Sequence, residues 1–255
     1  MKYGIQMYSV RDVAKTDLHE ALKKVAEIGY REIEFAGFFD HTAKEVRQWL
    51  DELGLECCST HTKFDLIKPD QIDNTIAYHK EIGCDTIIIP GGVPIGTPEE
   101  LETSCKILNE ACKKMKENGM RLGYHNHSPE FIPSPFGKLL IVELLQRTQI
   151  DLEVDTFWAF NAGVDPIAFL EAHKDRIRIL HLKDGIPTIP ENRTWEKWNK
   201  EAKGKALGEG KAPIAEIRDW AIRNGVQIVV ESEGLDPTGP EEVARCLDYL
   251  KKIGK

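Results

Sequence analysis

The sequence predicts a single (β/α)8 TIM barrel of the α/β class, and three observations support this prediction. The chain has 255 residues, a length typical of one barrel domain. Short apolar runs alternate eight times with amphipathic helical stretches, which is typical of a parallel sheet. A glycine separates a helix from the next strand five times, at Gly29, Gly54, Gly83, Gly119 and Gly225. Eight units in this length favour a closed barrel over an open doubly wound sheet.

The strands are predicted where short apolar runs recur along the chain. They cover Tyr3–Tyr8, Glu32–Phe35, Glu56–Thr60, Thr86–Pro90, Arg121–Asn126, Asp151–Asp155, Ile177–Leu182 and Gln227–Glu231. No GxGxxG motif opens the first helix, which counts against a dinucleotide-binding fold.

The helices are predicted from apolar residues that recur with helical spacing. In the first helix, Asp17–Ile28, one stripe contains Leu18, Leu22 and Val25. The others begin at Thr42, Pro69, Pro98, Lys138, Asp165, Ile214 and Gly239. Thr97 before Pro98 is typical of a helix cap followed by a proline in the first turn, and Asp165 before Pro166 repeats this pattern.

The segment from Asp184 to Pro213 interrupts the alternation. It contains Trp195 and Trp198 in the motif TWEKW and ends in LGEGKAP. A loop of this length inside a compact domain is usually functional or mobile. We therefore expect residues 1–255 to form one domain, with a long insertion after the seventh strand at about 184–212, on the catalytic end of the barrel.

Composition limits the classes of function. With 41% hydrophobic and 30% charged residues, the chain can bury a sizeable core. A net charge of −8 counts against nucleic acid as a partner, and no apolar run approaches the ~20 residues of a membrane span. The start, MKYGIQMYSVRD, lacks the apolar run of a signal peptide, and the six cysteines show no CxxC spacing. We expect a cytoplasmic protein with small buried thiols.

Acids, histidines and one lysine gather at the carboxyl ends of the predicted strands, where polar groups in a barrel carry chemistry. They are Glu34, His61, His125, His127, Glu153, Asp155, His181, Lys183, Glu231 and Glu233. Because side chains alternate along a strand, His125 shares a face with His127, and His181 shares one with Lys183. Two imidazoles and two carboxylates from four strands suit one divalent metal ion, and the absence of a thiolate argues against structural zinc.

Longer motifs extend this pattern from end to end of the chain. They include GIQMYSVRD, VAEIGYREIEFAG, LDELGLECCSTH, LGYHNHSPEF, DLEVDTFWAFNAGVDP, ILHLKDG and IVVESEG. By these motifs the chain resembles the sugar phosphate isomerase/epimerase-like branch of the xylose isomerase-like TIM barrels. YHNH and HLKD are specific for the branch but not for a substrate. The superfamily also holds inosose dehydratases, hydroxypyruvate isomerases, ketose 3-epimerases, dehydroshikimate dehydratases and endonuclease IV.

The resemblance implies one divalent metal ion held by an acid on strand five, an aspartate on strand six, a histidine on strand seven and a glutamate on strand eight. The matching positions are His125, Asp155, His181 and Glu231. His125 departs from the pattern, because better-characterised relatives have a glutamate there. We expect Mn2+, with Zn2+, Co2+, Fe2+ and Mg2+ as alternatives.

In the epimerases two glutamates flank the substrate carbon, and one removes the proton that the other returns. Only Glu231 stands at a matching position here, so His125 is either a metal ligand or the second base, a role that His127 or Glu130 could also fill. We expect Glu231 to remove a proton beside a carbonyl polarised by the metal, and Lys183 to neutralise charge or donate a proton at the resulting enediolate. The expected substrate contacts are Glu34, His61, Glu130, Trp158 and Trp195.

These roles predict a divalent-metal-dependent sugar isomerase or epimerase. A dehydratase or lyase acting on a keto-sugar or inosose through the same site is the alternative, and a non-catalytic sugar-binding barrel is a further one. The acidic chain disfavours the DNA repair chemistry of endonuclease IV. The expected partner is a small sugar, keto-sugar or polyol. The aromatic residues of the insertion also allow a homo-oligomer.

Overall fold

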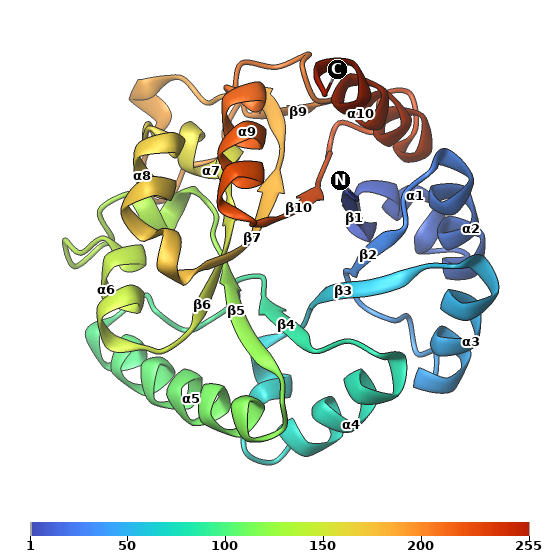
Figure 1. Ribbon diagram of the computed structural model, residues 1–255. Helices are drawn as coiled ribbons and strands as arrows, with labels where there is room; N and C mark the ends of the chain where they lie inside the picture. Colours follow the sequence, from blue (N-terminus) through green and yellow to red (C-terminus); the bar gives the residue numbers. More distant parts are fainter. Residues whose placement is uncertain (1, 255) are drawn as a thin grey trace.

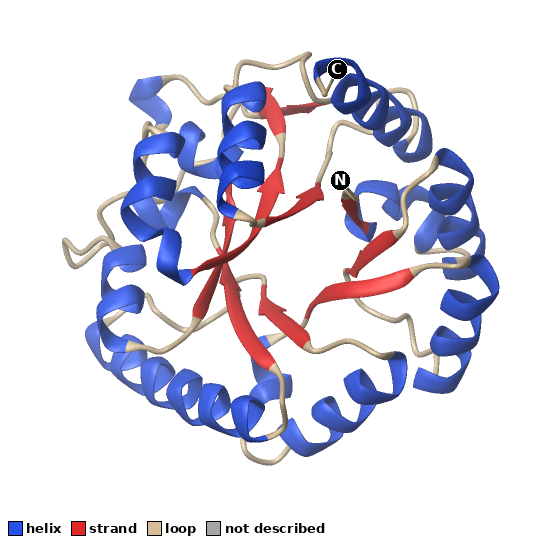
Figure 2. Ribbon diagram, viewed as in Figure 1, coloured by secondary structure: helices blue, strands red, loops and turns tan. Residues whose placement is uncertain are grey.

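The strands close into a parallel barrel. In the computed structural model, which describes residues 2–254, the barrel strands pair in the order β1-β10-β7-β6-β5-β4-β3-β2. Helices surround this ring on the outside (Figures 1 and 2). The predicted (β/α)8 fold is confirmed. The barrel strands are β1 Gly4–Gln6, β2 Glu32–Phe35, β3 Glu56–His61, β4 Thr86–Ile89, β5 Arg121–His125, β6 Asp151–Asp155, β7 Ile177–Leu182 and β10 Gln227–Val230.

The first and last residues of the strands agree with the predicted ones to within about one residue, except in β1. That strand ends at Gln6, and a 3-10 helix, η1 Met7–Val10, follows it where the prediction continued to Tyr8. The side-chain oxygen of Gln6 accepts a hydrogen bond from the backbone N–H of Tyr8 at 3.0 Å. This bond caps the helical turn and takes the chain out of the sheet.

The described residues form ten α-helices, of which eight were predicted and the two shortest were not. They are α1 Arg11–Ala14, α2 Leu18–Ile28, α3 Ala43–Leu53, α4 Ile72–Ile82, α5 Pro98–Glu117, α6 Leu140–Arg147, α7 Thr156–Asn161, α8 Pro166–His173, α9 Ile214–Asn224 and α10 Gly239–Ile253. Thr97 caps α5 and Asp165 caps α8, each with a proline in the first turn. Gly54 and Gly83 end α3 and α4 with φ of 62° and 80°, a left-handed conformation that favours glycine.

Two helices begin later than predicted because loop hydrogen bonds occupy the residues before them. Helix α4 begins at Ile72 rather than Pro69, since the carbonyl of Lys68 accepts from the N–H groups of Gln71 and Ile72 at 2.9 Å each. Helix α6 begins at Leu140 rather than Lys138, whose N–H donates to the Ser134 hydroxyl at 3.0 Å.

The segment that leaves β7 contains a small antiparallel hairpin. Strand β8 Asp184–Ile186 pairs with β9 Lys203–Lys205, with a 3-10 helix, η5 Pro190–Asn192, between them. The buried carboxylate of Asp184 accepts hydrogen bonds of 2.8–3.0 Å from the N–H groups of Gly185, Gly208, Gly210 and Ala212. One carboxylate therefore ties the beginning of the segment to the LGEG motif near its end.

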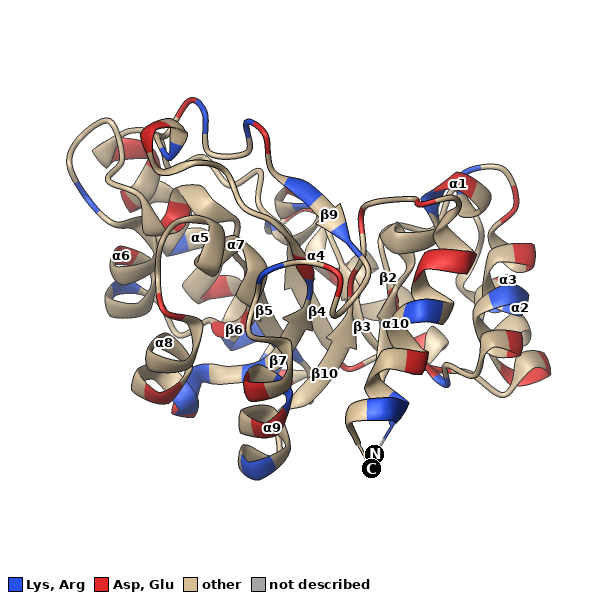
Figure 3. Ribbon diagram, turned by 90° about the horizontal axis from the view of Figure 1, so that it is seen from above, with Lys and Arg blue, Asp and Glu red and all other residues tan. Residues whose placement is uncertain are grey.

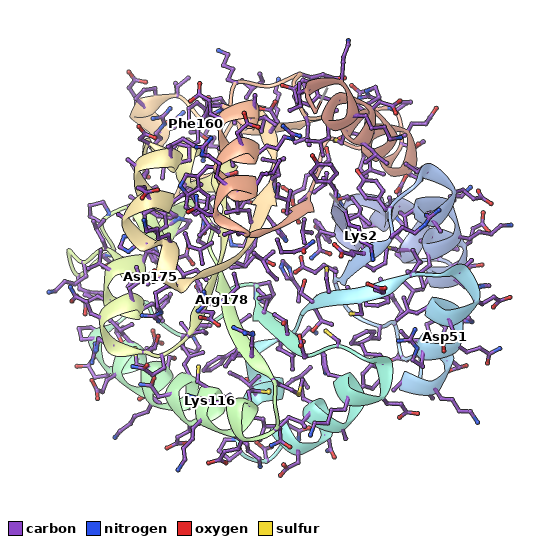
Figure 4. The ribbon with its side chains drawn as sticks, in the orientation of Figure 1. Lys2, Asp51, Lys116, Phe160, Asp175 and Arg178 are labelled. Carbon is purple, nitrogen blue, oxygen red and sulfur yellow. The ribbon has the colours of Figure 1, made fainter. Side chains whose placement is uncertain are left out.

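The barrel is filled and its exterior carries both signs of charge. Side chains occupy the space inside the ring of strands and project outward from the helices, as Asp51 does on α3 (Figure 4). Lysines and arginines are interspersed with acids along the outer helices (Figure 3). Among residues 2–254, no helix has both the length and the apolar character that crossing a membrane requires.

Candidate metal centre and active site

The site rests on an apolar floor inside the barrel. Ile88, Ile179 and Val229 form a small buried cluster there. Gly123 leaves room for this floor, since a Cβ atom at that position would lie 2.5 Å from Cδ1 of Ile88. Because side chains alternate, the residue two places beyond Ile179 on β7 also points inward, and that residue is His181. The strands thus change from apolar to polar side chains as they approach the open end of the barrel.

Four residues from consecutive strands form the first candidate metal-ligand set. One ligand atom from each of His125, Asp155, His181 and Glu231 lies within 4.8 Å of the others, and all four residues are buried. Nε2 of His125 lies 3.6 Å from Oδ2 of Asp155, and Nδ1 of His181 lies 3.3 Å from Oε2 of Glu231. The structure therefore brings together the four residues predicted as ligands.

Several buried atoms in this cluster lack a hydrogen-bond partner. Within the described part of the chain, these atoms are both ring nitrogens of His125, Oδ2 of Asp155 and Oε1 of Glu153. Buried polar atoms are nearly always paired, so these unpaired atoms call for a further partner. Imidazole nitrogens and carboxylate oxygens are common ligand atoms for a divalent cation. The residues present fit such an ion.

Glu231 and Lys183 form a buried ion pair beside the ligand set. Their Oε2 and Nζ atoms lie 3.1 Å apart, and Nζ also lies 3.6 Å from Oδ2 of Asp155 and 2.5 Å from Oε2 of Glu233. Burial raises the pKa of the Glu231 carboxyl, but the positive charges of Lys183 and His181 outweigh burial and hold it well below its ordinary value. Glu231 is thus held as a carboxylate and Lys183 as an ammonium ion.

Glu34 lies under the cluster and holds His181. Its Oε1 accepts from Nε2 of His181 and from the amide of Gln6, both at 2.6 Å, and its Oε2 accepts from the Ser59 hydroxyl at 2.5 Å. Burial raises the pKa of this carboxyl, but His61 and His181 together lower the pKa by more than burial raises it. The carboxyl of Glu34 therefore stays ionised. Glu34 is fully buried and does not line the open cavity. The geometry gives it an orienting role rather than a substrate contact.

A second candidate ligand set overlaps the first. It consists of His61, His125, Glu153 and His181. Nε2 of His61 lies 2.7 Å from Oε2 of Glu153, and Nε2 of His181 lies 3.2 Å from the same oxygen. Burial, together with the nearby Glu34 carboxylate, raises the pKa of Glu153 well above its ordinary value. Because the two sets share His125 and His181, they form one continuous polar layer.

His127 lies above His125 at the wall of the cavity. The ring centroids of the two histidines are 4.9 Å apart. Burial, with His125 and Lys183 nearby, lowers the pKa of His127 to about 3, so the ring is neutral at physiological pH. Burial likewise lowers the pKa of His125 well below its ordinary value. Neutral imidazoles are the form that binds metal ions.

The remaining predicted substrate contacts lie in different surroundings. The carboxylate of Glu130 accepts from the Tyr124 hydroxyl at 2.7 Å and from the His127 N–H at 3.0 Å, which uses both of its oxygens inside the fold. The ring of Trp158 lies 4.6 Å from Nζ of Lys183 and packs on Trp198. Trp195 packs against a separate apolar cluster of the core. The structure does not bring Glu130 or Trp195 to the cluster.

A cavity of about 910 Å3 opens above the histidines. His61, His125, His127, Glu231 and Glu233 line its deep end. From there it extends outward over the ends of β2 and β3 to α4. None of the described residues between 151 and 213 lines it. Trp158 and Trp195 therefore do not face this space.

Some residues of the site were not among those expected. Gln6 and Ser59 hold Glu34, Glu233 pairs with Lys183, and Trp198 rather than Trp195 contacts His127, with ring centroids 5.5 Å apart. The alternation of side chains gives a signal for Glu233, which lies two residues after Glu231 on the same face. Gln6 and Ser59 give no comparable signal, because nothing local distinguishes them from other polar strand residues.

Comparison with known proteins places this geometry in a family. A family model described as a xylose isomerase-like TIM barrel matches residues 22–253. An inosose dehydratase of Geobacillus kaustophilus is 26% identical over 188 residues, which cover 65% of this chain and 61% of that protein. A 2-oxo-tetronate isomerase of Haemophilus influenzae is 26% identical over 166 residues, which cover 56% of this chain and 64% of that protein. The matched part spans less than two thirds of each relative.

A solved structure extends the match to the whole fold. The structure of a sugar phosphate isomerase/epimerase from Parabacteroides distasonis is 24% identical and superposes with a TM-score of 0.80, over 98% of each chain. At this identity the superposition shows a common fold. The match of the family model covers most of the sequence and confirms the predicted family. The chain belongs to the xylose isomerase-like TIM barrel family.

Proposed function

We propose that this protein is an enzyme that removes a proton beside the carbonyl of a sugar or related polyol, and so isomerises, epimerises or dehydrates it. The observation that carries the proposal is the buried Lys183–Glu231 pair, which lies beside unpaired ligand atoms at the open end of the barrel. The names of the two relatives, inosose dehydratase and 2-oxo-tetronate isomerase, support a substrate of this kind.

His125, Asp155, His181 and Glu231 would hold one divalent metal ion. When bound, the ion would polarise the substrate carbonyl and stabilise negative charge on its oxygen. The neutral imidazole of His125 and the unpaired Oδ2 of Asp155 support this assignment. Once His181 releases its proton on binding, two neutral imidazoles and two carboxylates would cancel the charge of the ion.

Glu231 would accept the proton from the substrate carbon. Its carboxylate is kept ionised by Lys183, and its residue lines the deep end of the cavity. The Lys183 ammonium, fixed among three carboxylates, would stabilise the negative charge that the proton leaves behind or return a proton to it. His61 and His127, on the cavity wall, would orient the substrate hydroxyls.

The enediolate that results has more than one fate. Return of the proton to the neighbouring carbon gives the isomer, return to the opposite face gives the epimer, and loss of a β-hydroxyl gives dehydration. The position of Glu233 favours dehydration as the second candidate. Its carboxylate lies 2.5 Å from Nζ of Lys183 and lines the cavity, so Glu233 would relay a proton from the Lys183 ammonium to a departing hydroxyl.

Solvent deuterium exchange tests the proposal. The protein is incubated in D2O with a panel of keto-sugars and keto-inositols, with and without Mn2+, and deuterium at carbon is measured by mass spectrometry. We expect exchange that depends on the metal and is lost in Glu231→Gln at a metal concentration that saturates the variant. Loss of water accompanies the exchange if the reaction is dehydration.

Glu110→Gln is the matched control, because Glu110 is exposed on α5 and belongs neither to the ligand sets nor to the cavity lining. This variant should exchange like the unaltered protein. Absence of exchange with every compound that binds would contradict catalysis and favour a non-catalytic sugar-binding barrel.

A further inference from the structure

The cavity extends beyond the residues that the proposed reaction uses. Away from the histidines it continues into a part that we call the aromatic lobe, defined by Phe38, Phe39, His41, Leu66 and Tyr78. The lobe lies between the loop after β2, the loop after β3 and helix α4. The volume of about 910 Å3 lies near the upper end of the range, roughly 300–1,000 Å3, of pockets for drug-sized ligands. The lobe therefore adds space to the deep end of the cavity at the histidines.

The rim of the lobe exposes large apolar side chains. Phe39 is 48% exposed and Leu66 is 41% exposed, and Tyr8, across the cavity, is 44% exposed. Isolated exposed apolar residues are ordinary, but these three border the same cavity. Apolar side chains gathered at a concave surface mark a place where an apolar group binds.

The backbone holds Phe39 at this rim in an unfavourable conformation. Phe39 and Asp40 have φ of 49° and 65°, in the left-handed region that bulky residues seldom adopt. A hydrogen bond of 3.0 Å from the N–H of His41 to the carbonyl of Phe38 closes this turn. Residues held in such conformations concentrate at ligand sites, where the surrounding structure fixes them.

The wall behind the rim is rigid and aromatic. The rings of Phe38 and Tyr78 have centroids 4.5 Å apart, and the Tyr78 hydroxyl donates to the carbonyl of His41 at 2.9 Å. Phe38 also packs on Phe35 at the end of β2, at 5.1 Å. The lobe is therefore formed before any ligand arrives, which reduces the entropic cost of binding.

Charge at the lobe is sparse. Of the described side chains that line the cavity, Lys63 is the one lysine and no arginine is present, while Asp40 supplies a negative charge at the same end. A phosphate group is usually bound by arginine or by several cationic side chains, and the lining supplies one exposed lysine. The walls instead suit a flat, uncharged group, since aromatic rings attract one another face to edge or in offset stacks.

We propose that the aromatic lobe is a second subsite, which binds an aromatic or apolar substituent carried by the sugar or polyol. The inference rests on the proposed function for the position of the polyol at the histidines. The substrate class is then an uncharged conjugate, with a polar ring at His61 and His127 and an apolar group between Phe39, Leu66 and Tyr78.

Two matched probes test this subsite. Phenyl β-D-glucoside and methyl β-D-glucoside share one sugar and differ in the substituent, and their dissociation constants can be measured by ligand-observed NMR on the protein with Mg2+. We expect the phenyl compound to bind about tenfold tighter or more. Two variants should each reduce this preference at least about threefold: Leu66→Ala, and Phe39→Gly, which removes the ring and tolerates the positive φ. Neither should change the dissociation constant of the methyl compound.

The control variant is Leu139→Ala, because Leu139 is 40% exposed but does not line the cavity. It should preserve the preference for the phenyl compound. Equal binding of the two glucosides, binding of neither, or a preference that survives in Phe39→Gly would each overturn the inference. A change from dimer to monomer in Phe39→Gly, with ligand binding unchanged, would instead assign the rim to contact with a second copy of the chain.

The subsite and the proposed reaction can fail separately. Preference for the phenyl compound that depends on Phe39, without deuterium exchange in any keto-sugar, would keep the subsite and reject the reaction. Exchange in a simple keto-sugar with no preference for the phenyl compound would keep the reaction and reject the subsite.

Discussion

The ammonium group of Lys183 lies 3.1 Å from the carboxylate of Glu231, and both groups are buried in the open end of the barrel. The same nitrogen lies 2.5 Å from Glu233 and 3.6 Å from Asp155. One cation therefore balances three acids that would otherwise repel each other. A buried ion pair of this kind contributes little net stability, but loss of one partner leaves an uncompensated charge.

Lys183→Met should impair both activity and folding. Without the ammonium, the charge left after proton removal loses one of its two stabilising cations, so we expect about a hundredfold loss in the rate of deuterium exchange. The three unbalanced carboxylates should lower the free energy of unfolding in urea by about 3–5 kcal/mol. Lys113→Met, at a lysine that is 80% exposed, should change neither quantity. Exchange at the ordinary rate in Lys183→Met would remove Lys183 from the mechanism.

His125→Gln should weaken metal binding. Both ring nitrogens of His125 are unpaired among the described residues, so the substitution removes a preformed donor rather than an existing hydrogen bond. We expect the dissociation constant for Mn2+, measured by isothermal titration calorimetry, to rise at least about tenfold. His173→Gln, on α8, is the matched histidine control. Unchanged affinity in His125→Gln would show that the fourth ligand lies elsewhere, and Glu153 would then be the next residue to test.

Glu130 should make stability depend on pH. Burial raises the pKa of its carboxyl to about 6, although the Tyr124 hydroxyl and backbone N–H groups act in the opposite direction. The folded protein therefore binds a proton more tightly than the unfolded chain, whose ordinary value is 4.5. The stabilisation is present below pH about 4.5 and is lost as the pH rises through about 6.

In Glu130→Gln this contribution is absent. Relative to the variant, the unaltered protein should lose about 2 kcal/mol of unfolding free energy between pH 4.5 and 7, measured by urea titration at each pH. Glu110→Gln controls for the loss of an exposed carboxyl. A difference between the unaltered protein and Glu130→Gln that does not vary with pH would mean that Glu130 titrates normally.

Asp184→Asn should loosen the segment that follows β7. Each carboxylate oxygen accepts from two N–H groups, so replacing one oxygen by an amide NH2 leaves two of the four donors without an acceptor. We expect a loss of about 1–3 kcal/mol in unfolding free energy and faster amide hydrogen exchange at Gly208 and Gly210. Asp175→Asn, at an exposed aspartate before β7, should have neither effect. Equal protection of both glycines in Asp184→Asn would show that other contacts order the segment.

Much of the fold could be predicted because it depends on local regularities. Strands β2, β6 and β7 begin and end at the predicted residues, since an apolar run between turns specifies a buried parallel strand. Helix α7, directly after β6, was not predicted, because Asp155 both ends a strand and caps this helix through the Trp158 N–H at 2.9 Å. Such a dual role leaves no gap in the sequence between two elements.

The clustering of the four predicted ligand residues was predictable from the sequence, but the contacts of the surrounding residues were not. His125, Asp155, His181 and Glu231 converge because parallel strands all end at one rim of the barrel. The role of Glu130 was not predictable from spacing, because its carboxylate turns back to Tyr124 on the same strand-to-loop connection. The partners of Glu34 were not predictable either, since its hydrogen bonds to Gln6 and Ser59 depend on the stagger between neighbouring strands.

Much of the cavity wall lies in a different stretch of chain from Asp155, His181 and Lys183, although His125 and Glu231 border both the cavity and the proposed ion site. Residues 36–79 supply most of the wall, whereas Asp155, His181 and Lys183 come from the half of the barrel that does not line it. The loops after β2 and β3 can therefore diverge without disturbing the reactive groups. A gene duplicate that altered only those loops would keep its chemistry and acquire a new ligand, so selection can tune recognition and reactivity in this barrel independently.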